Sequence, residues 1–158
     1  GALLLVLLSL AFNVYQPVFA GLALALLLLG WLVKTAYWSS IDRARPQSTL
    51  ETATGLGGGG PVRLLEMPHT EENFLMREMG YQVARAHAAR LRAITHVALF
   101  LAPIALIALI AAGVVPIGLA LLMAALAVVS AGLGILTERW LFFAEARHTC
   151  MLYYGHPA

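Results

Sequence analysis

The chain has 158 residues, of which 61% are hydrophobic and 11% are charged, and its mean hydropathy is +0.83. A soluble domain is typically about 25% charged and cannot bury this much aliphatic surface in one core, so the composition predicts an integral membrane protein. The net charge of +2, without a basic stripe that carries interleaved aromatic residues, argues against nucleic-acid binding. The single cysteine, Cys150, excludes an internal disulfide and an iron–sulfur cluster held by this chain alone.

Two apolar segments open the chain. Residues 1–12 would span only about 18 Å as a helix, which is short of a hydrocarbon core of about 30 Å. They follow neither a Met nor a positively charged region, so we expect the tail of a truncated membrane span, with this chain the C-terminal part of a longer protein, and not a signal peptide. After a polar turn at 13–17, residues 18–38 predict a full transmembrane helix.

Aromatic and basic side chains mark the end of this second segment. Trp31, Tyr37 and Trp38 are expected to be interfacial anchors. Lys34 is expected to lay its aliphatic stem along lipid while its ammonium reaches water.

A polar stretch, residues 39–92, lies between the apolar blocks. Its first part, residues 39–69, is predicted to be an irregular loop rich in Gly and Pro. The string GLGGGG at 55–60 matches G-x-G-x-x-G, but no strand precedes it and Pro61 follows where a helix should begin. We therefore predict a flexible loop at this string and not a nucleotide site.

Residues 70–92 predict an amphipathic helix with Thr70 as its N-cap and carboxylates in its first turn. We expect this helix to continue into the next span. Its polar side carries the candidate residues for docking a partner subunit, which are Arg77, Arg85 and Arg92.

The rest of the chain predicts two more transmembrane helices, at 93–112 and 117–137, joined by a tight turn at 113–116. Pro103 removes one backbone donor and is expected to free the Leu99 carbonyl. A close-packing face for a neighbouring helix is expected at Ser130, Ala131, Gly132 and Gly134.

The last residues, 138–158, are amphipathic and aromatic and predict an interfacial C-terminal tail. The predicted fold class is thus an all-α integral membrane protein. It is a transmembrane helix bundle with three full spans, a truncated N-terminal span and one amphipathic helix in a large polar loop.

Basic residues predict the orientation of the bundle. All ten Lys and Arg lie within 34–92 or in the tail, at Arg139 and Arg147, whereas the turns at 13–17 and 113–116 have none. The positive-inside rule therefore places the polar loop and the C-terminus in the cytoplasm, with the chain as a multi-pass protein of the inner (plasma) membrane.

Metal binding is not expected. His148 and Cys150 form an H-x-C pair, but two ligands do not make a zinc site, and His156 is the only further candidate nearby. A bis-histidine haem needs two facing histidines at membrane depth, and only His96 lies in a predicted span.

Ionisable residues near the ends of two spans predict a quinol site. Oxidation of a quinol needs a proton acceptor for its hydroxyl groups beside an apolar slot for its ring. The candidate residues are His96, Glu138, Arg139 and Trp140, with Phe142 and Phe143 around them. The alternative is structural, with Glu138 and Arg139 as an interfacial ion pair and His96 as a helix-capping donor.

Several polar strings of this chain resemble the membrane-anchor subunit of dimethyl sulfoxide reductase. They cover most of the polar parts and are ETATGLG at 51–57, MPHTEENFLMREMGYQVARAHAARLR at 67–92, ERWLFFAEARH at 138–148 and LYYG at 152–155. The apolar spans are similar only in kind.

The resemblance implies about half of an eight-span anchor that lacks haem. Such an anchor oxidises menaquinol or a related quinol in anaerobic respiration and passes electrons to an iron–sulfur subunit, which feeds a molybdopterin catalytic subunit. The chain would be the quinol-oxidising, membrane-attaching part of an oxidoreductase complex and not a catalyst alone, with no covalently bound or metal cofactor of its own.

Two alternatives stay open. One is a haem b-containing quinol-oxidising anchor of a related reductase, which a visible absorption spectrum would distinguish. The other is half of an unrelated membrane transporter. Transporters usually place ionisable residues near the middle of the bilayer, where the predicted spans carry none.

Overall fold

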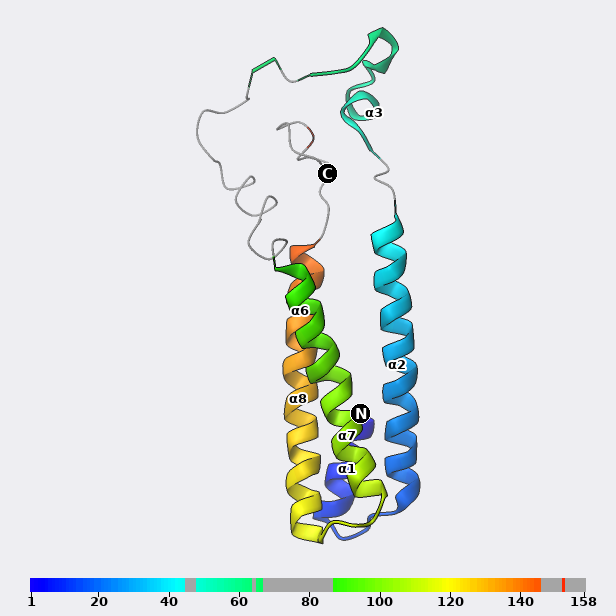
Figure 1. Cartoon of the computed structure of the whole chain (residues 1–158), viewed down its shortest axis with the longest axis vertical. Helices are drawn as coiled ribbons and strands as arrows, with labels where there is room; N and C mark the ends of the chain where they lie inside the picture. The colour runs from blue at the N-terminus through cyan, green and yellow to red at the C-terminus, as the bar shows by residue number, and fades with distance from the viewer. Residues whose placement is uncertain (45–47, 64, 67–86, 146–151, 153–158) are drawn as a thin grey trace. The chain divides into compact units, whose positions relative to one another are not determined.

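The structure is a computed structural model that describes residues 1–44, 48–63, 65, 66, 87–145 and 152. All regular elements in this part of the chain are helical (Figure 1), which confirms the predicted all-α class. They are α1 (Ala2–Ala11), α2 (Pro17–Arg43), α3 (Leu50–Thr54), the short 3₁₀ helix η1 (Gly57–Gly59), α6 (Ala88–Thr95), the π-helical segment η2 (His96–Leu101), α7 (Ala102–Ala111) and α8 (Ile117–Ala144).

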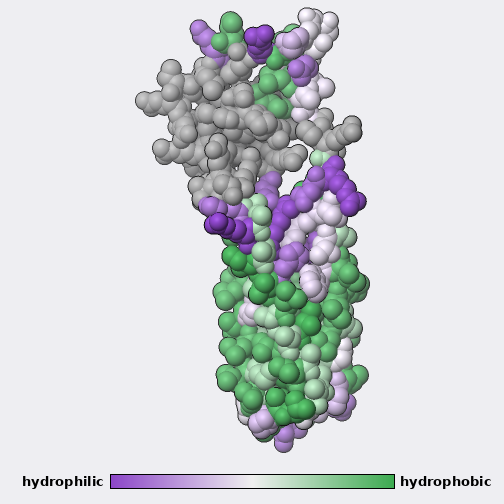
Figure 2. Space-filling view, in the orientation of Figure 1, coloured by the Kyte–Doolittle hydropathy of each residue, from purple (hydrophilic) through white to green (hydrophobic). Residues whose placement is uncertain are grey.

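Three helices are long and apolar enough to cross a membrane, namely Pro17–Arg43, Ala88–Ala111 and Ile117–Phe143. This confirms the prediction of a multi-pass membrane protein. The sides of these helices present an almost continuous hydrophobic surface (Figure 2), as lipid contact requires. The helix α1 has 10 residues and is therefore only about 15 Å long.

The chain divides into two compact units. The first comprises Gly1–Asp42 and Ala89–Leu141, and the second comprises Arg43–Ala88 and Phe142–Ala158. The first unit is the helix bundle. Its buried core draws on four helices and consists of Val6, Leu10, Ala20, Ala23, Ile107, Ile110, Ala120, Met123, Ala124 and Ala127.

In the second unit, the segment predicted to be irregular contains a short helix. Thr49 caps α3 through a reciprocal pair of hydrogen bonds with Thr52, and Gly55 ends the helix in the left-handed conformation with φ +70°. Two threonines three residues apart are a sequence signal for the start of a helix. The high glycine and proline content of this segment led to the prediction of an irregular loop instead. Most of the amphipathic helix predicted at 70–92 lies outside the described residues, but the chain is helical from Ala88 and continues into the span.

The two turns at one end of the bundle each need a left-handed residue. Asn13 has φ +58°, and it and Val14 donate backbone hydrogen bonds to Leu10 and Ser9 at 3.2 and 2.8 Å. Gly113 has φ +70° and donates to the Ile110 carbonyl at 3.1 Å. These bonds satisfy carbonyls that a helix C-terminus would otherwise leave exposed at the membrane boundary.

Small residues along one face of α8 allow close helix packing. Buried or partly buried positions recur at alternating spacings of four and three residues: Ala120, Ala124, Ala127, Ala131, Gly134, Glu138 and Leu141. Helices associate closely in membranes when small residues line their interface. Of the predicted packing face, Ala131 and Gly134 belong to this buried seam, whereas Gly132 has no other atom within 4 Å of where its Cβ would lie.

The π-helical segment η2 changes which carbonyl Pro103 leaves without a donor. The Ala102 N–H bonds to the Val97 carbonyl, five residues back. In the same register Pro103 would face the Ala98 carbonyl, but proline has no N–H. Ser130 of α8 supplies the missing donor, because its hydroxyl bonds to the Ala98 carbonyl at 2.8 Å. The expectation that Leu99 would be the freed carbonyl assumed α-helical spacing and is corrected here.

The helix α8 packs very closely against η2 at Gly134. A Cβ atom on this residue would lie 2.6 Å from both the backbone nitrogen and the Cβ of Leu99. No side chain fits there unless the two helices move apart.

This contact predicts a matched pair of stability effects. Gly134→Ala should lower the free energy of unfolding by about 1–3 kcal/mol, because overpacking must separate two backbones. Gly132→Ala should be neutral or slightly stabilising, since its Cβ would enter open space and alanine favours a helix. Unfolding of the detergent-solubilised protein by increasing SDS would measure both variants, and equal effects would contradict the close contact.

Candidate functional site

Two oppositely charged side chains lie near the edge of the hydrocarbon core. The turns at Asn13 and Gly113 lie at one end of the bundle, where α2 and α8 begin. Measured along each helix from that end, Lys34 lies about 25 Å along α2 and Glu138 about 31 Å along α8. The hydrocarbon core of a bilayer is about 30 Å thick. Both side chains are therefore at the end of the bundle opposite the turns, near the boundary between hydrocarbon and water.

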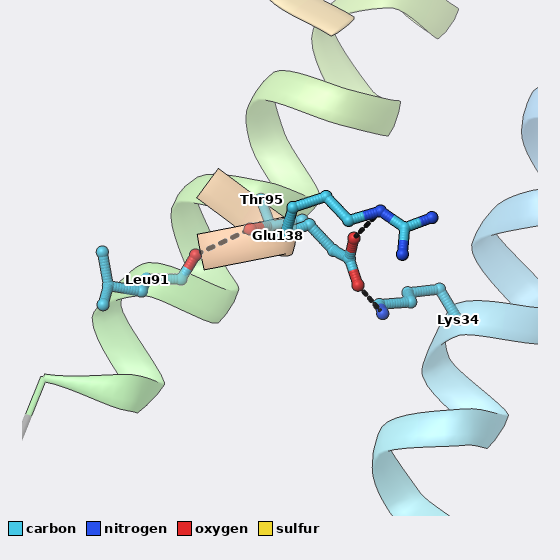
Figure 3. Close-up of polar contacts among 5 residues, drawn as sticks. Lys34, Leu91, Thr95 and Glu138 are labelled. Atoms are coloured by element: carbon cyan, nitrogen blue, oxygen red, sulfur yellow. Dashed lines mark hydrogen bonds and ion pairs between the residues drawn. The ribbon is translucent and has the colours of Figure 1, made fainter. Parts of the chain in front are cut away.

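Lys34 and Glu138 form an ion pair that joins α2 to α8. Figure 3 shows the ammonium and the carboxylate pointing toward each other, and their side chains are only 17% and 14% exposed. The second carboxylate oxygen lies 3.7 Å from Nε of Arg139, whose side chain is 70% exposed. The ion pair with Arg139 that the sequence suggested is thus present, but Lys34 is the more enclosed partner of Glu138.

Aromatic rings hold the other side of the Lys34 ammonium. It lies 4.6 Å from the centre of the Tyr37 ring and 4.9 Å from that of Trp38. Cation–π contacts of this kind stabilise a charge that has lost part of its hydration. The expectation that Lys34 extends into water is therefore wrong: it faces a carboxylate and two rings of its own bundle.

His96 begins the π-helical segment and is held by aromatic side chains of α2. The indole N–H of Trp31 donates to Nδ1 of His96 at 2.9 Å. The Trp38 ring meets the imidazole edge to face, with centroids 5.0 Å apart at 83°. Nδ1 is an acceptor, so His96 is neutral with its proton on Nε2 in this arrangement. Its role here is not that of a helix cap.

Trp31 and Trp38 face the bundle interior. Trp38 is only 6% exposed, and the Trp31 ring stacks on Phe100 with centroids 6.3 Å apart. The prediction that both are lipid-interface anchors is therefore replaced by a packing role beside His96.

Arg92 lies against Trp38 and pairs with Asp42. One of its terminal nitrogens bonds to both carboxylate oxygens of Asp42, at 2.8 and 3.0 Å, and its guanidinium lies 5.5 Å from the Trp38 ring. Arg92, expected to dock a partner, thus links α6 to the end of α2. The other two docking candidates, Arg77 and Arg85, lie outside the described residues.

Thr95, also labelled in Figure 3, is fully buried, yet its hydroxyl is used within its own helix. It donates to the Leu91 carbonyl at 3.0 Å. Such a bond to the preceding turn satisfies a hydroxyl at membrane depth. Thr95 therefore contributes packing, and its proton is not directed at Glu138.

The structure thus connects two of the predicted site residues through α2. Trp38 touches His96 and Lys34, and Lys34 pairs with Glu138. We call Trp31, Lys34, Trp38, His96 and Glu138 the boundary cluster.

The remaining predicted site residues lie at its margin or beyond it. Arg139 flanks the cluster, and Trp140 is 47% exposed. Within the described part of the chain, no three His, Cys, Asp or Glu side chains are grouped to hold a metal ion. His148, Cys150 and His156 lie outside it.

The α2 members of the cluster had a recognisable signal that the sequence reasoning missed. Partly or fully buried positions on α2 recur every three or four residues and are Ala20, Ala23, Leu27, Trp31, Lys34 and Trp38. The spacing that buries the alanines therefore also turns Lys34 inward.

The cluster can perform two kinds of chemistry at the membrane boundary. The Glu138 carboxylate can accept a proton, and the Lys34 ammonium, held by two rings, stays in place when that carboxylate becomes neutral. The Nε2 proton of His96 can be donated in a hydrogen bond to an oxygen of a ligand. Acid–base and hydrogen-bonding groups beside an apolar surface suit a lipid-soluble molecule with polar oxygens.

The chain is a helical membrane protein with this cluster near one end of its bundle, and its sequence is similar to that of a sulfite dehydrogenase component. Over 139 residues, or 86% of the chain, it is 32% identical to a protein of Allochromatium vinosum that is one of the subunits of sulfite dehydrogenase. The match covers 40% of the length of that relative, so this chain corresponds to less than half of it. No protein-family profile matches the chain, and no solved structure matches it.

The ion pair predicts a coupled effect on stability. Lys34→Met should lower the free energy of unfolding by about 2 kcal/mol, less than the 3–5 kcal/mol for a fully buried pair, because it leaves Glu138 charged and poorly hydrated. Glu138→Gln should cost about 1 kcal/mol, since Tyr37 and Trp38 still hold the ammonium. The double variant should recover most of the loss.

The measurement is a double-mutant cycle from SDS unfolding in detergent, with Arg139→Gln as the control. This exposed arginine should change stability by less than about 0.5 kcal/mol. Additive effects of Lys34→Met and Glu138→Gln would show that the two side chains do not interact.

Proposed function

We propose that the chain is part of the membrane subunit of an oxidoreductase complex, and that its boundary cluster exchanges protons and hydrogen bonds with a quinone. The observation that carries this proposal is the Lys34–Glu138 pair, enclosed between α2 and α8 at the edge of the hydrocarbon core. Ionisable groups at such a depth are costly unless they are paired or functional. The similarity to a component of a sulfite dehydrogenase supports the oxidoreductase class.

A quinone fits the chemistry of the cluster. Its ring and tail are apolar and partition into the bilayer, while its two oxygens need hydrogen-bond donors when oxidised and proton acceptors when reduced. Near the membrane surface, His96 provides a hydrogen-bond donor and Glu138 provides a proton acceptor. Menaquinol is the quinol that the resemblance to dimethyl sulfoxide reductase anchors implies.

The partners proposed for the chain follow from the same resemblance. An iron–sulfur subunit would carry electrons between the quinone and a molybdopterin catalytic subunit, both attached to the aqueous face of the anchor. The membrane subunit would supply the quinone site and hold the complex on the bilayer.

The two similarities suggest opposite directions of electron flow. A dimethyl sulfoxide reductase anchor takes electrons from menaquinol, whereas a sulfite dehydrogenase removes electrons from sulfite. In the second case we propose that this chain passes the electrons to a quinone. Membranes containing the complex distinguish the two. Sulfite-dependent reduction of a menaquinone analogue supports the second direction, and quinol-dependent reduction of dimethyl sulfoxide supports the first.

Removing the carboxylate tests the role of Glu138 in either direction. Glu138→Gln should lower the quinone-linked turnover of the complex about 100-fold, because general acid–base groups typically contribute 10²–10⁴-fold. Electron transfer between the soluble substrate and an artificial dye that bypasses the membrane should be unchanged. Equal turnover of variant and wild type with the quinone would exclude Glu138 as the proton acceptor.

The proposed orientation has its own test. The polar loop lies in the cytoplasm by the distribution of Lys and Arg. In a Cys150→Ser background, Ser48→Cys should react with a membrane-impermeant maleimide only after the cells are permeabilised. Labelling of intact cells would place the loop outside and overturn this orientation.

A further inference from the structure

We propose that Trp31 is a positioning residue that keeps His96 a hydrogen-bond donor to a quinone carbonyl, while Glu138 alone handles the proton. This inference rests on the proposed function for the identity of the ligand. It gives separate roles to His96 and Glu138, which the sequence predicts only as members of one quinol site together with Arg139 and Trp140.

The geometry that carries it is the contact between the two rings. The Trp31 indole N–H can only donate, so Nδ1 of His96, 2.9 Å away, must be the acceptor. The one remaining proton of a neutral imidazole is then on Nε2. A proton on Nδ1 would point at the indole N–H and break the bond. His96 therefore has no free lone pair with which to accept a proton from a quinol.

The Trp31 ring is itself held in place. It stacks on Phe100 of the π-helical segment with an interplanar angle of 15°, and Phe100 is only 6% exposed. His96 and Phe100 are four residues apart in this segment, so both lie on the side that meets Trp31. π-Helical turns within α-helices frequently occur at functional sites.

The surroundings of His96 are aromatic and contain two cations that are both paired with carboxylates. The Trp38 ring touches the imidazole, and the Lys34 ammonium and the Arg92 guanidinium both lie against the same indole, at 4.9 and 5.5 Å. Each cation is paired with a carboxylate, Glu138 or Asp42. Because both cations are paired, the neutral form of His96 rests on the Trp31 hydrogen bond.

The proposed roles balance for one quinol. Its two electrons would leave singly to a one-electron acceptor of the complex, for which the proposed function names an iron–sulfur subunit. Its two hydroxyl protons pass one after the other to the Glu138 carboxylate and on to water, so Glu138 returns to its charged form. The Nε2 proton of His96 stays on His96 and forms a hydrogen bond to one of the two oxygens that become carbonyls. Reduction of a quinone runs through the same steps in reverse.

The state of His96 is measured directly by ¹⁵N NMR of histidine-labelled complex in lipid nanodiscs, with His96→Gln to assign the signal. In the wild type, His96 should be neutral with its proton on Nε2 across the pH range in which turnover is measured. Trp31→Phe keeps a ring on Phe100 but removes the N–H, so His96 should exchange tautomers and titrate. The matched control, Trp38→Phe, removes a different indole beside the same imidazole and should preserve the Nε2 tautomer.

Kinetics test the role assigned to this tautomer. In Trp31→Phe, KM for a menaquinone analogue should rise about tenfold at neutral pH, the loss expected for one hydrogen bond, and return toward the wild-type value at the lower pH where the NMR spectrum shows His96 protonated, because the cation again carries a proton on Nε2. The kcat should change little, because Glu138 is intact. The wild type should lack this pH dependence of KM.

The possible results distinguish failure of the roles given to Trp31 and His96 from failure of the proposed quinone function. Protonation on Nδ1 or ordinary titration of His96 in the wild type would overturn the positioning role. The expected NMR result with an unchanged KM in Trp31→Phe at every pH would overturn the donor role of His96. Absence of quinone-dependent turnover even in the wild type would instead refute the proposed function, and the quinone role of His96 with it.

Discussion

The structure depends on one constraint, which is that charged groups at the edge of the hydrocarbon core must be compensated within the protein. Lys34 and Glu138 meet this constraint through each other, and the rings of Tyr37 and Trp38 complete the surroundings of the ammonium. Each charge lies on the buried face of its helix, so neither α2 nor α8 can rotate toward lipid without exposing it. The pair therefore fixes the rotation of both helices about their axes.

Close backbone packing makes this arrangement possible. The seam of alanine and glycine on α8 brings that helix against η2 and α7, with Gly134 in contact with Leu99. Pro103 and the π-helical register leave the Ala98 carbonyl without a backbone donor, and Ser130 supplies one from the neighbouring helix. The carbonyl that Pro103 leaves without a backbone donor thus forms a hydrogen bond between two helices.

The sequence predicts the fold class well because hydrophobic length determines which segments span a bilayer. It also located Glu138 and His96 near one end of the bundle, since consecutive spans alternate in direction. It did not predict the partners of these residues. Lys34 and the two tryptophans resemble ordinary interfacial residues by composition, and only their spacing relative to Ala20 and Ala23 shows that they face inward. The π-helical register moves the unsatisfied carbonyl from Leu99 to Ala98, and Pro103 alone does not distinguish this register from α-helical spacing.

The central claim is that the boundary cluster is a quinone site formed by α2, η2 and α8. The most direct test is a cryo-electron microscopy structure of the complex in nanodiscs with a bound menaquinone analogue. The account predicts one oxygen of the analogue within hydrogen-bond distance of His96 Nε2, with Lys34 and Glu138 paired beside it. An analogue bound at the turn end of the bundle, or Lys34 and Glu138 facing lipid apart from each other, would contradict it.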